Sequence, residues 1–387
     1  MARSASWGWG KGIDGREAAR LAAQQALSRL GAGRPAFGVV FVSHEFELSP
    51  VLNGLGSVLG DTPLWGISTF RPIISAGEQA RSVVVGLLAG ADLSAKVSLW
   101  PRFAQNSAET AGQVLQALRA ETGELDGVLL ASDGIHGDIS RICAALTDIS
   151  VPVAGCMASG DIFRGKTFQV GGKQVGSGSL SVATLGGLKI GMGIGHGWTD
   201  IGIFYEINRA RDIWVQQLGA MPAAEAYSKV LGYPVRDWAF PPLNELVRLY
   251  PLGVEVTPGS KDLIIRSPLQ MEVDGSLRMN IPVAQGQVAR LLIGDRSSCL
   301  EAARQAASTA VKALGKSQGL LALILVDQAW QYLFQSESSR FINAVKSEIG
   351  EIPLIGGYTL GQVYRPEGES LVRAYNQNLL VVIFGES

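Results

Sequence analysis

Three histidines are the side chains of this 387-residue sequence best suited to chemistry near neutral pH. They are His44, His136 and His196, and they lie far apart in the sequence. His196 and Trp198 stand in GIGHGWTDIG (193–202), where neighbouring glycines allow the backbone to approach a ligand or to turn sharply. We therefore expect both side chains to line a cleft. His136, in SDGIHGD, is a second candidate for a pocket wall.

No catalytic template accompanies these histidines. Residues 10–15, GKGIDG, match the dinucleotide pattern G-x-G-x-x-G, but no acidic residue lies about 20 residues further on. The sequence contains no G-x-S-x-G, no H-E-x-x-H and no P-loop. The cysteines, Cys143, Cys156 and Cys299, form no C-x-x-C pair, so we expect them in the core.

These residue patterns favour a binding protein without a resident cofactor over an enzyme. Two other classes stay open. In an enzyme, His136 or His196 would act as general base near Asp133 or Asp161. In a haem-based gas sensor, a histidine would be the axial ligand.

The composition is that of a folded, well-buried protein. Hydrophobic residues make up 47% of the chain and charged residues 17%, with a net charge of −1. A chain without a basic stripe is not expected to bind nucleic acid. Neither a signal peptide nor a membrane-spanning apolar run of about 18 residues is visible. We expect a cytoplasmic protein.

Three stretches of the chain share one helix pattern. Each begins with a capping residue followed three positions later by Glu; the caps are Asp14, Asn106 and Ser298. Behind the first and third caps, apolar residues fall at the same six offsets, on one helical face. The first set is Ala19, Ala22, Ala23, Ala26, Leu27 and Leu30; the third is Ala303, Ala306, Ala307, Ala310, Val311 and Leu314.

Apolar strands follow each helix at similar spacing. The first strands are expected at 37–42, 127–131 and 320–326, and the last at 82–88, 180–187 and 378–385. Between them each copy reads Pro, two apolar residues and Gly, at 63–66, 152–155 and 353–356. The pattern predicts an α/β fold with mixed sheets, built from repeated helix-strand-helix-strand-strand units.

We expect two domains with a boundary near residue 232. Residues 1–232 would hold two copies, 1–95 and 96–205, and a helical tail. Residues 233–387 would hold the third copy.

Polar side chains that follow the Pro-x-x-Gly segments are the best candidates for ligand contacts. Ligands of open α/β sheets bind beyond the carboxyl ends of the strands. Arg71 could hold a ligand carboxylate with two hydrogen bonds. The full set of candidates in these turns is Ser68, Thr69, Arg71, Tyr358, Thr359 and Gln362.

Several of these segments resemble the FIST family. GISTFRP (66–72), HGW (196–198) and the helix-like MPAAEAYSKVLG (221–232) match elements of the FIST N-terminal region. PLGVEV (251–256), DGSL (274–277) and PLIGGYTLGQ (353–362) match elements of its C-terminal region, with Gln362 in place of the usual glutamate. The resemblance implies a sensory protein that binds a small ligand, such as an amino acid or similar metabolite, and signals through contact with a partner protein.

Overall fold

Three units of the same architecture form the body of the protein in the computed structural model, which describes residues 3–386 apart from 122, 124, 257–262 and 366–368. The first unit contains β1 (Ser4–Lys11), α1 (Gly15–Leu30), β2 (Pro35–Ser43), α2 (Leu48–Leu59), β3 (Leu64–Thr69) and β6 (Ser82–Ala89). The second contains β7 (Ser94–Trp100), α3 (Ser107–Arg119), β8 (Gly127–Ser132), α4 (Ile139–Ala145), β9 (Val153–Ala158) and β12 (Leu180–Gly186). The third contains β13 (Lys189–Gly195), α7 (Arg296–Leu314), β22 (Gly319–Asp327), α8 (Ala329–Phe334), α9 (Ser339–Ile349), β23 (Leu354–Tyr364) and β25 (Leu379–Gly385).

The strand order is the same in each unit. It runs first, last, second, third: β1-β6-β2-β3, β7-β12-β8-β9 and β13-β25-β22-β23. The two strands joined by the second helix are parallel, and the other pairs within a unit are antiparallel. The predicted α/β fold with mixed sheets is confirmed, and each unit also opens with a strand before its first helix.

Pairing between strands of different units joins the units. β23 pairs with β9 of the second unit and with β4 (Pro72–Ile74) of the first. β3 pairs with β10 (Phe168–Gly171), which forms a hairpin with β11 (Gln174–Ser177). β5 (Gly77–Glu78) pairs with β4, and β24 (Arg373–Tyr375) pairs with the end of β23.

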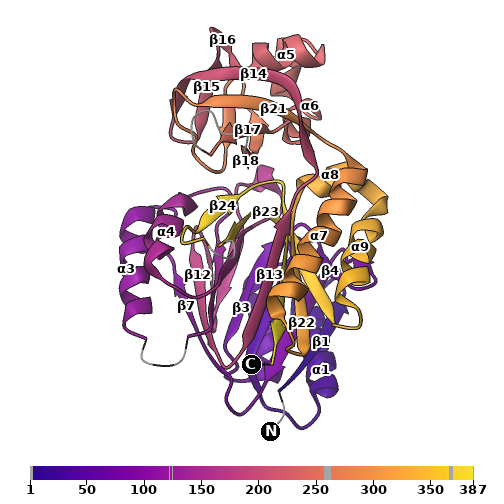
Figure 1. Cartoon of the computed structure of the whole chain (residues 1–387). Coiled ribbons are helices and arrows are strands. Elements are labelled where there is room, and N and C mark those ends of the chain that lie inside the picture. Colours follow the sequence, from indigo (N-terminus) through magenta and orange to yellow (C-terminus); the bar gives the residue numbers. More distant parts are fainter. Residues whose placement is uncertain (1–2, 122, 124, 257–262, 366–368, 387) are drawn as a thin grey trace.

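The helices cover the outside of the sheets (Figure 1). Inside, one core cluster joins strands of all three units, as Phe41, Leu129 and Leu323 show. Each unit has a further cluster between its sheet and its helices. The Ala-rich faces predicted for α1 and α7 are buried there.

Two of the three predicted helix caps are confirmed. Asp14 accepts a hydrogen bond from the backbone N–H of Arg16, and Asn106 accepts one from that of Glu109. The third prediction is wrong: Asp295, rather than Ser298, caps α7 and accepts from Ser298 N–H at 2.7 Å. The carboxylate of Asp295 is an equally good cap, so the helix begins earlier than Ser298.

Glycines in the opening strands let helices α1 and α7 pack directly on the sheet. A Cβ added to Gly10 would lie 2.0 Å from the carbonyl oxygen of Ala18 in α1. One added to Gly193 would lie 2.1 Å from that of Ala306 in α7. Gly10 of GKGIDG and the three glycines of GIGHG, Gly193, Gly195 and Gly197, therefore make room for a helix backbone.

An inserted domain, residues 198–294, separates β13 from α7 in the third unit (Figure 1). It contains β14 (Trp198–Arg211), β15 (Trp214–Leu218), β16 (Met221–Pro222), α5 (Ala223–Leu231), α6 (Leu243–Leu246), β17 (Leu252–Glu255), β18 (Leu263–Arg266), β19 (Pro268–Met271), β20 (Leu277–Met279) and β21 (Val288–Gly294). Its strands form one sheet in the order β18-β17-β21-β14-β15-β20-β19.

Strand pairing groups the residues differently from the expected division at residue 232. β13, before that residue, pairs with β25 at the end of the chain. β14 and β21 lie on opposite sides of residue 232 and pair within the inserted domain. Strand pairing therefore crosses residue 232, and the division of the chain into two consecutive domains stays a prediction.

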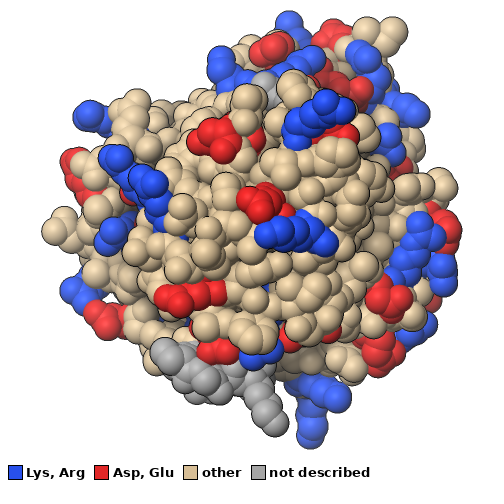
Figure 2. Space-filling view, turned by 90° about the horizontal axis from the view of Figure 1, so that it is seen from above, with Lys and Arg blue, Asp and Glu red and all other residues tan. Residues whose placement is uncertain are grey.

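The surface carries charges of both signs. Seen from above, Lys, Arg, Asp and Glu are interspersed with uncharged surface (Figure 2). In the part of the chain that the structure describes, no helix is long and apolar enough to span a bilayer.

All three cysteines are buried, as predicted. Cys143 lies on the core face of α4 with Ile139 and Ile142. Burial raises the pKa of the Cys143 thiol to about 12 and also raises those of Cys156 and Cys299.

These cysteines are therefore expected to be inert in the folded protein, because the thiolate is the reactive form and needs access to reagent. Iodoacetamide should add no mass to the native protein over an hour and should alkylate three sites in urea. Rapid native alkylation, located by peptide mapping, would contradict the burial of the modified residue.

Candidate functional site

The segments after the three Pro-x-x-Gly motifs meet at the ends of β3 and β9 and in the middle of β23. The turn predicted after the third motif is wrong, because Leu354–Tyr364 is one continuous strand. Thr69 Oγ1 and Ser159 Oγ both donate to the Tyr358 carbonyl, at 2.8 and 2.7 Å. Ser68 Oγ donates to the Ser159 carbonyl at 3.0 Å. The structure brings Ser68, Thr69 and Tyr358 together, but their polar groups bond to one another and join the units.

Thr359 and Gln362 lie in the same buried junction. Thr359 Oγ1 donates to the Val326 carbonyl at 3.2 Å, and Gln362 Nε2 donates to Thr359 Oγ1 at 2.7 Å. Both side chains are fully buried. Gln362 Oε1 has no hydrogen-bond partner among the described residues.

Arg71 lies at the edge of this junction and is held by an ion pair. Its Nη1 is 2.9 Å from Glu78 Oε2, and its guanidinium lies over the Phe70 ring. The other Glu78 oxygen accepts from Tyr358 Oη at 3.1 Å. Burial, and to a smaller extent the negative charge of Glu78, raises the pKa of Tyr358 well above its usual value. In this arrangement Arg71 already has a carboxylate partner.

His196 and Trp198 occupy the turn between the third unit and the inserted domain. The His196 side chain is exposed, and its Nδ1 accepts from the Trp198 backbone N–H at 3.3 Å. Trp198 is buried, with its ring 6.2 Å from that of Trp330. His196 contacts this turn, and Trp198 packs in an aromatic cluster. Their expected place at a ligand cleft stays a prediction.

His136 lies beside Asp133, whose carboxylate accepts hydrogen bonds from backbone N–H groups. Its Nδ1 is 3.5 Å from Asp133 Oδ1, which also accepts from the N–H groups of Ile135 and His136. Asp133 Oδ2 accepts from Thr167 and Gly178. Burial opposes ionisation, but the His136 and backbone hydrogen bonds outweigh it, and the pKa of Asp133 is lowered.

In each unit, one carboxylate accepts a hydrogen bond from the backbone of the turn before the last strand. The residue just before the last strand region has a positive φ in all three: Arg81, Gly178 and Gln377. Its N–H donates to a carboxylate at the end of the second strand, supplied by Glu45, Asp133 and Asp327 respectively. Each of these carboxylates therefore fixes the turn before the last strand by accepting from its backbone N–H.

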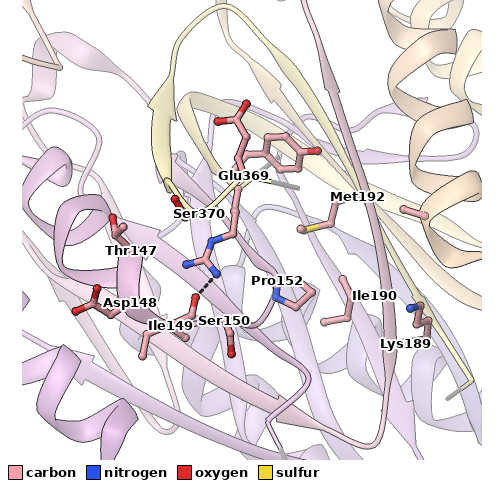
Figure 3. Close-up of a pocket in the computed structure, with 13 residues that line it drawn as sticks. Thr147, Asp148, Ile149, Ser150, Pro152, Lys189, Ile190, Met192, Glu369 and Ser370 are labelled. Carbon is pink, nitrogen blue, oxygen red and sulfur yellow. Dashed lines mark hydrogen bonds between the residues drawn. The ribbon is translucent and has the colours of Figure 1, made fainter. Parts of the chain in front are cut away.

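A hollow of about 520 Å³ opens at the opposite edge of the sheets, between the second and third units (Figure 3). One wall is the segment before β9, and Lys189, Ile190 and Met192 of β13 form the other (Figure 3). The whole lining is Thr147, Asp148, Ile149, Ser150, Pro152, Lys189, Ile190, Met192, Ala313, Tyr364, Arg365, Glu369 and Ser370. Its size is within the range of pockets for small molecules.

Arg365 fixes the wall formed by residues 146–151. Its guanidinium donates to the carbonyls of Leu146, Ile149 and Val151, at 2.6 Å to Leu146 and 3.1 Å to Val151. Burial lowers the pKa of Arg365. Arg365 is therefore a positioning residue, and the cation able to reach a ligand in the hollow is Lys189, an exposed side chain.

The lining combines the three kinds of group that a small amphipathic metabolite would contact. Ile149, Ile190 and Met192 give an apolar surface. Lys189 adds a positive charge, and Asp148 and Glu369 add negative charges at the rim. The sequence predictions missed this site because it is assembled from strand starts and loops of two units and carries no motif.

No group of three or more His, Cys, Asp or Glu side chains among the described residues is arranged to hold a metal ion. His44, the remaining histidine, stacks on Phe70 with ring centroids 5.6 Å apart.

Three comparisons relate the chain to known proteins. No curated protein matches the chain. Among solved structures, a cyanuric acid hydrolase from A. caulinodans is 11% identical, with 48% of this chain and 71% of the other covered and a TM-score of 0.28. PurLQS from Thermotoga maritima is also 11% identical, with 100% and 72% covered and a TM-score of 0.25. These likenesses are too weak to support an argument.

Two family models, in contrast, match most of the chain. The FIST N domain matches residues 36–221, and the FIST C domain matches residues 223–365. FIST domains are regarded as sensory domains for small ligands. With both domains present in order, the chain belongs to the FIST family.

Proposed function

We propose that this protein is a small-ligand sensor whose ligand binds in the hollow between the second and third units. The observation that carries the proposal is the mixed lining, with Lys189 facing an apolar surface and two carboxylates at the rim. A pocket of this kind orients a ligand with a few polar contacts and gains affinity from apolar burial.

The charges of the lining suit a zwitterionic ligand. Lys189 can bind a carboxylate, and Asp148 or Glu369 can bind an ammonium group. The surface formed by Ile149, Ile190 and Met192 can hold an aliphatic side chain. An amino acid or a similar metabolite has this combination of groups, and its binding needs no cofactor.

The turn residues fit this role less well. Hydrogen-bond partners within the protein occupy Ser68, Thr69 and Thr359, and a ligand would have to break those bonds. Breaking a buried hydrogen bond leaves a group unsatisfied and costs about 1–3 kcal/mol. In the hollow, a ligand ammonium group would compete with solvent-accessible ion pairs, those of Asp148 with Arg119 and of Glu369 with Arg373, and such pairs contribute little free energy.

Signalling through a partner protein is the second part of the proposal. The inserted domain exposes large apolar side chains, with Phe204 64%, Phe240 60% and Tyr233 50% exposed. Protein partners commonly bury such exposed apolar side chains on contact. Those side chains are candidates for the contact with the partner.

Lys189→Ala is expected to weaken binding of the best ligand about tenfold, because a charge-assisted hydrogen bond is lost. A screen of the standard L-amino acids by thermal shift would select the ligand, and calorimetry would measure its affinity. The same amino acid as its amide should also bind weakly, because it lacks the carboxylate.

Lys229→Ala on α5 is the matched control, since Lys229 pairs with Glu225 far from the hollow lining. It should leave the affinity unchanged. Equal affinity of Lys189→Ala and wild type for the carboxylate ligand would overturn the assignment of the hollow.

A further inference from the structure

The run from Glu369 to Gln377 connects the hollow to the inserted domain. Glu369 lines the hollow and pairs with Arg373 at the start of β24. β24 lies along the end of β23, where Tyr364 and Arg365 also line the hollow. One short segment therefore begins at the proposed ligand and ends beside the inserted domain.

The far end of this run holds the inserted domain by side-chain hydrogen bonds. Asn376 Oδ1 accepts from Ser267 N–H at 3.2 Å, and Asn376 Nδ2 donates to Asn280 at 3.1 Å. Gln377 Nε2 lies 2.7 Å from both the Arg248 carbonyl and Ser267 Oγ. The partners belong to three different segments of the inserted domain, so this end of the run is a shared anchor.

Backbone contacts extend the anchor. Arg266 Nη1 donates to the Ala374 carbonyl at 3.0 Å. The Gln377 carbonyl accepts from Trp330 Nε1 at 2.9 Å. Gln377 has a positive φ of 64°, and its backbone N–H donates to Asp327 Oδ2 at 2.8 Å. A shift of β24 would therefore act on the inserted domain and on the third unit together.

Arg248 of the inserted domain makes this junction sensitive to small displacements. Arg248 is 1% exposed, and its Nη2 lies 3.6 Å from Asp327 Oδ1. Its Nε and Nη1 have no hydrogen-bond partner among the described residues. A buried charge with unpaired donors carries a desolvation cost that its ion pair offsets only in part.

We propose that residues 369–377 transmit ligand binding to the inserted domain. This inference rests on the proposed function. A ligand ammonium group in the hollow competes with Arg373 for Glu369, which frees the start of β24. The anchor at Asn376 and Gln377 then loosens, and the inserted domain opens more often from the body of the protein.

A covalent probe tests this transmission without the natural ligand. Ser150 is an exposed residue of the hollow lining, and the native cysteines are buried. Ser150→Cys would be modified with aminoethyl methanethiosulfonate, which places an ammonium group in the hollow. Hydrogen exchange of residues 246–250 and 263–268 would then be compared before and after modification.

Exchange in these two segments is expected to rise about threefold or more, since local opening sets the exchange rate. The control is Ser57→Cys on α2, an exposed position remote from the hollow lining, where the same modification should change neither segment. Unchanged exchange in the modified Ser150→Cys protein would overturn the inference.

A second variant tests the route itself. Gln377→Gly removes the side-chain hydrogen bonds to Arg248 and Ser267 but keeps a residue that accepts positive φ. We expect faster exchange in both segments before modification and no further rise after it. A full additional rise would show that the signal bypasses Gln377. If the probe acts as expected but no metabolite binds, the proposed ligand is wrong and the transmission stands.

Discussion

Gly193→Ala is expected to destabilise the protein by about 3 kcal/mol, because overpacking against a rigid neighbour has this order of cost. A Cβ at this position would lie 2.1 Å from the Ala306 carbonyl and 2.9 Å from Thr309 Cβ. Both belong to α7, which is buried along its Ala-rich face, so neither the helix nor β13 can move freely. Thermal unfolding followed by circular dichroism would measure the loss.

Gly112→Ala is the matched control. Gly112 lies on the exposed face of α3, and an added Cβ would meet nothing within 4 Å. Alanine in a helix interior is favoured over glycine by about 0.5–1 kcal/mol, so this variant should melt at or above the wild-type temperature. A Gly193→Ala protein that melts like wild type would refute the close packing of β13 on α7.

Asp327→Ala is expected to cost about 3–5 kcal/mol, the usual effect of removing one partner of a buried ion pair. The change leaves Arg248 buried without its counter-charge. It also removes the acceptor for the backbone N–H groups of Ala329 and Gln377. Burial raises the pKa of Asp327, and Arg248 opposes that effect. Chemical denaturation would give the change in the free energy of unfolding.

Two further variants separate the ion pair from other effects. Glu301→Ala removes a partner of Arg304 in an exposed pair, and such pairs contribute little to stability. The double variant Arg248→Met with Asp327→Leu should recover part of the loss, because it leaves no unpaired buried charge. A single Asp327→Ala variant as stable as wild type would contradict the role of this carboxylate in holding the junction.

The repeated architecture was predictable because it rests on local patterns. Buried strands such as β2, β8 and β22 are continuous apolar runs, and the helix faces follow a regular spacing. The opening strands were harder to recognise, since β13 is rich in glycine and glycine is depleted in strands. The reason for those glycines lies in α7, more than a hundred residues further along the chain.

The inserted domain is a second feature that the sequence patterns did not predict. β13 and α7 belong to one unit but are separated by residues 198–294. Nothing in the sequence of β13 indicates that its partner is β25, because pairing between distant strands depends on tertiary packing. The expected boundary at residue 232 therefore fell inside the inserted domain.

The candidate site was the least predictable feature. Ser68, Thr69 and Tyr358 do meet, but they lie in strands β3 and β23 and not in the turns expected after the Pro-x-x-Gly segments. Whether such groups face a ligand or one another depends on the distances between them in the folded protein. The spacing of residues in the sequence does not determine those distances. In the sequence, nothing distinguishes Lys189 and Met192 from other strand residues. They line the hollow because the fold brings the segment before β9 opposite them.

Hydrogen exchange with and without ligand tests the location of the site most directly. The ligand would be the amino acid selected by the thermal-shift screen, added well above its dissociation constant. We expect slower exchange in residues 147–152, 189–192 and 364–365, which line the hollow. Protection confined to the turns at 66–71 and 356–362, with no change at the hollow, would contradict the assignment.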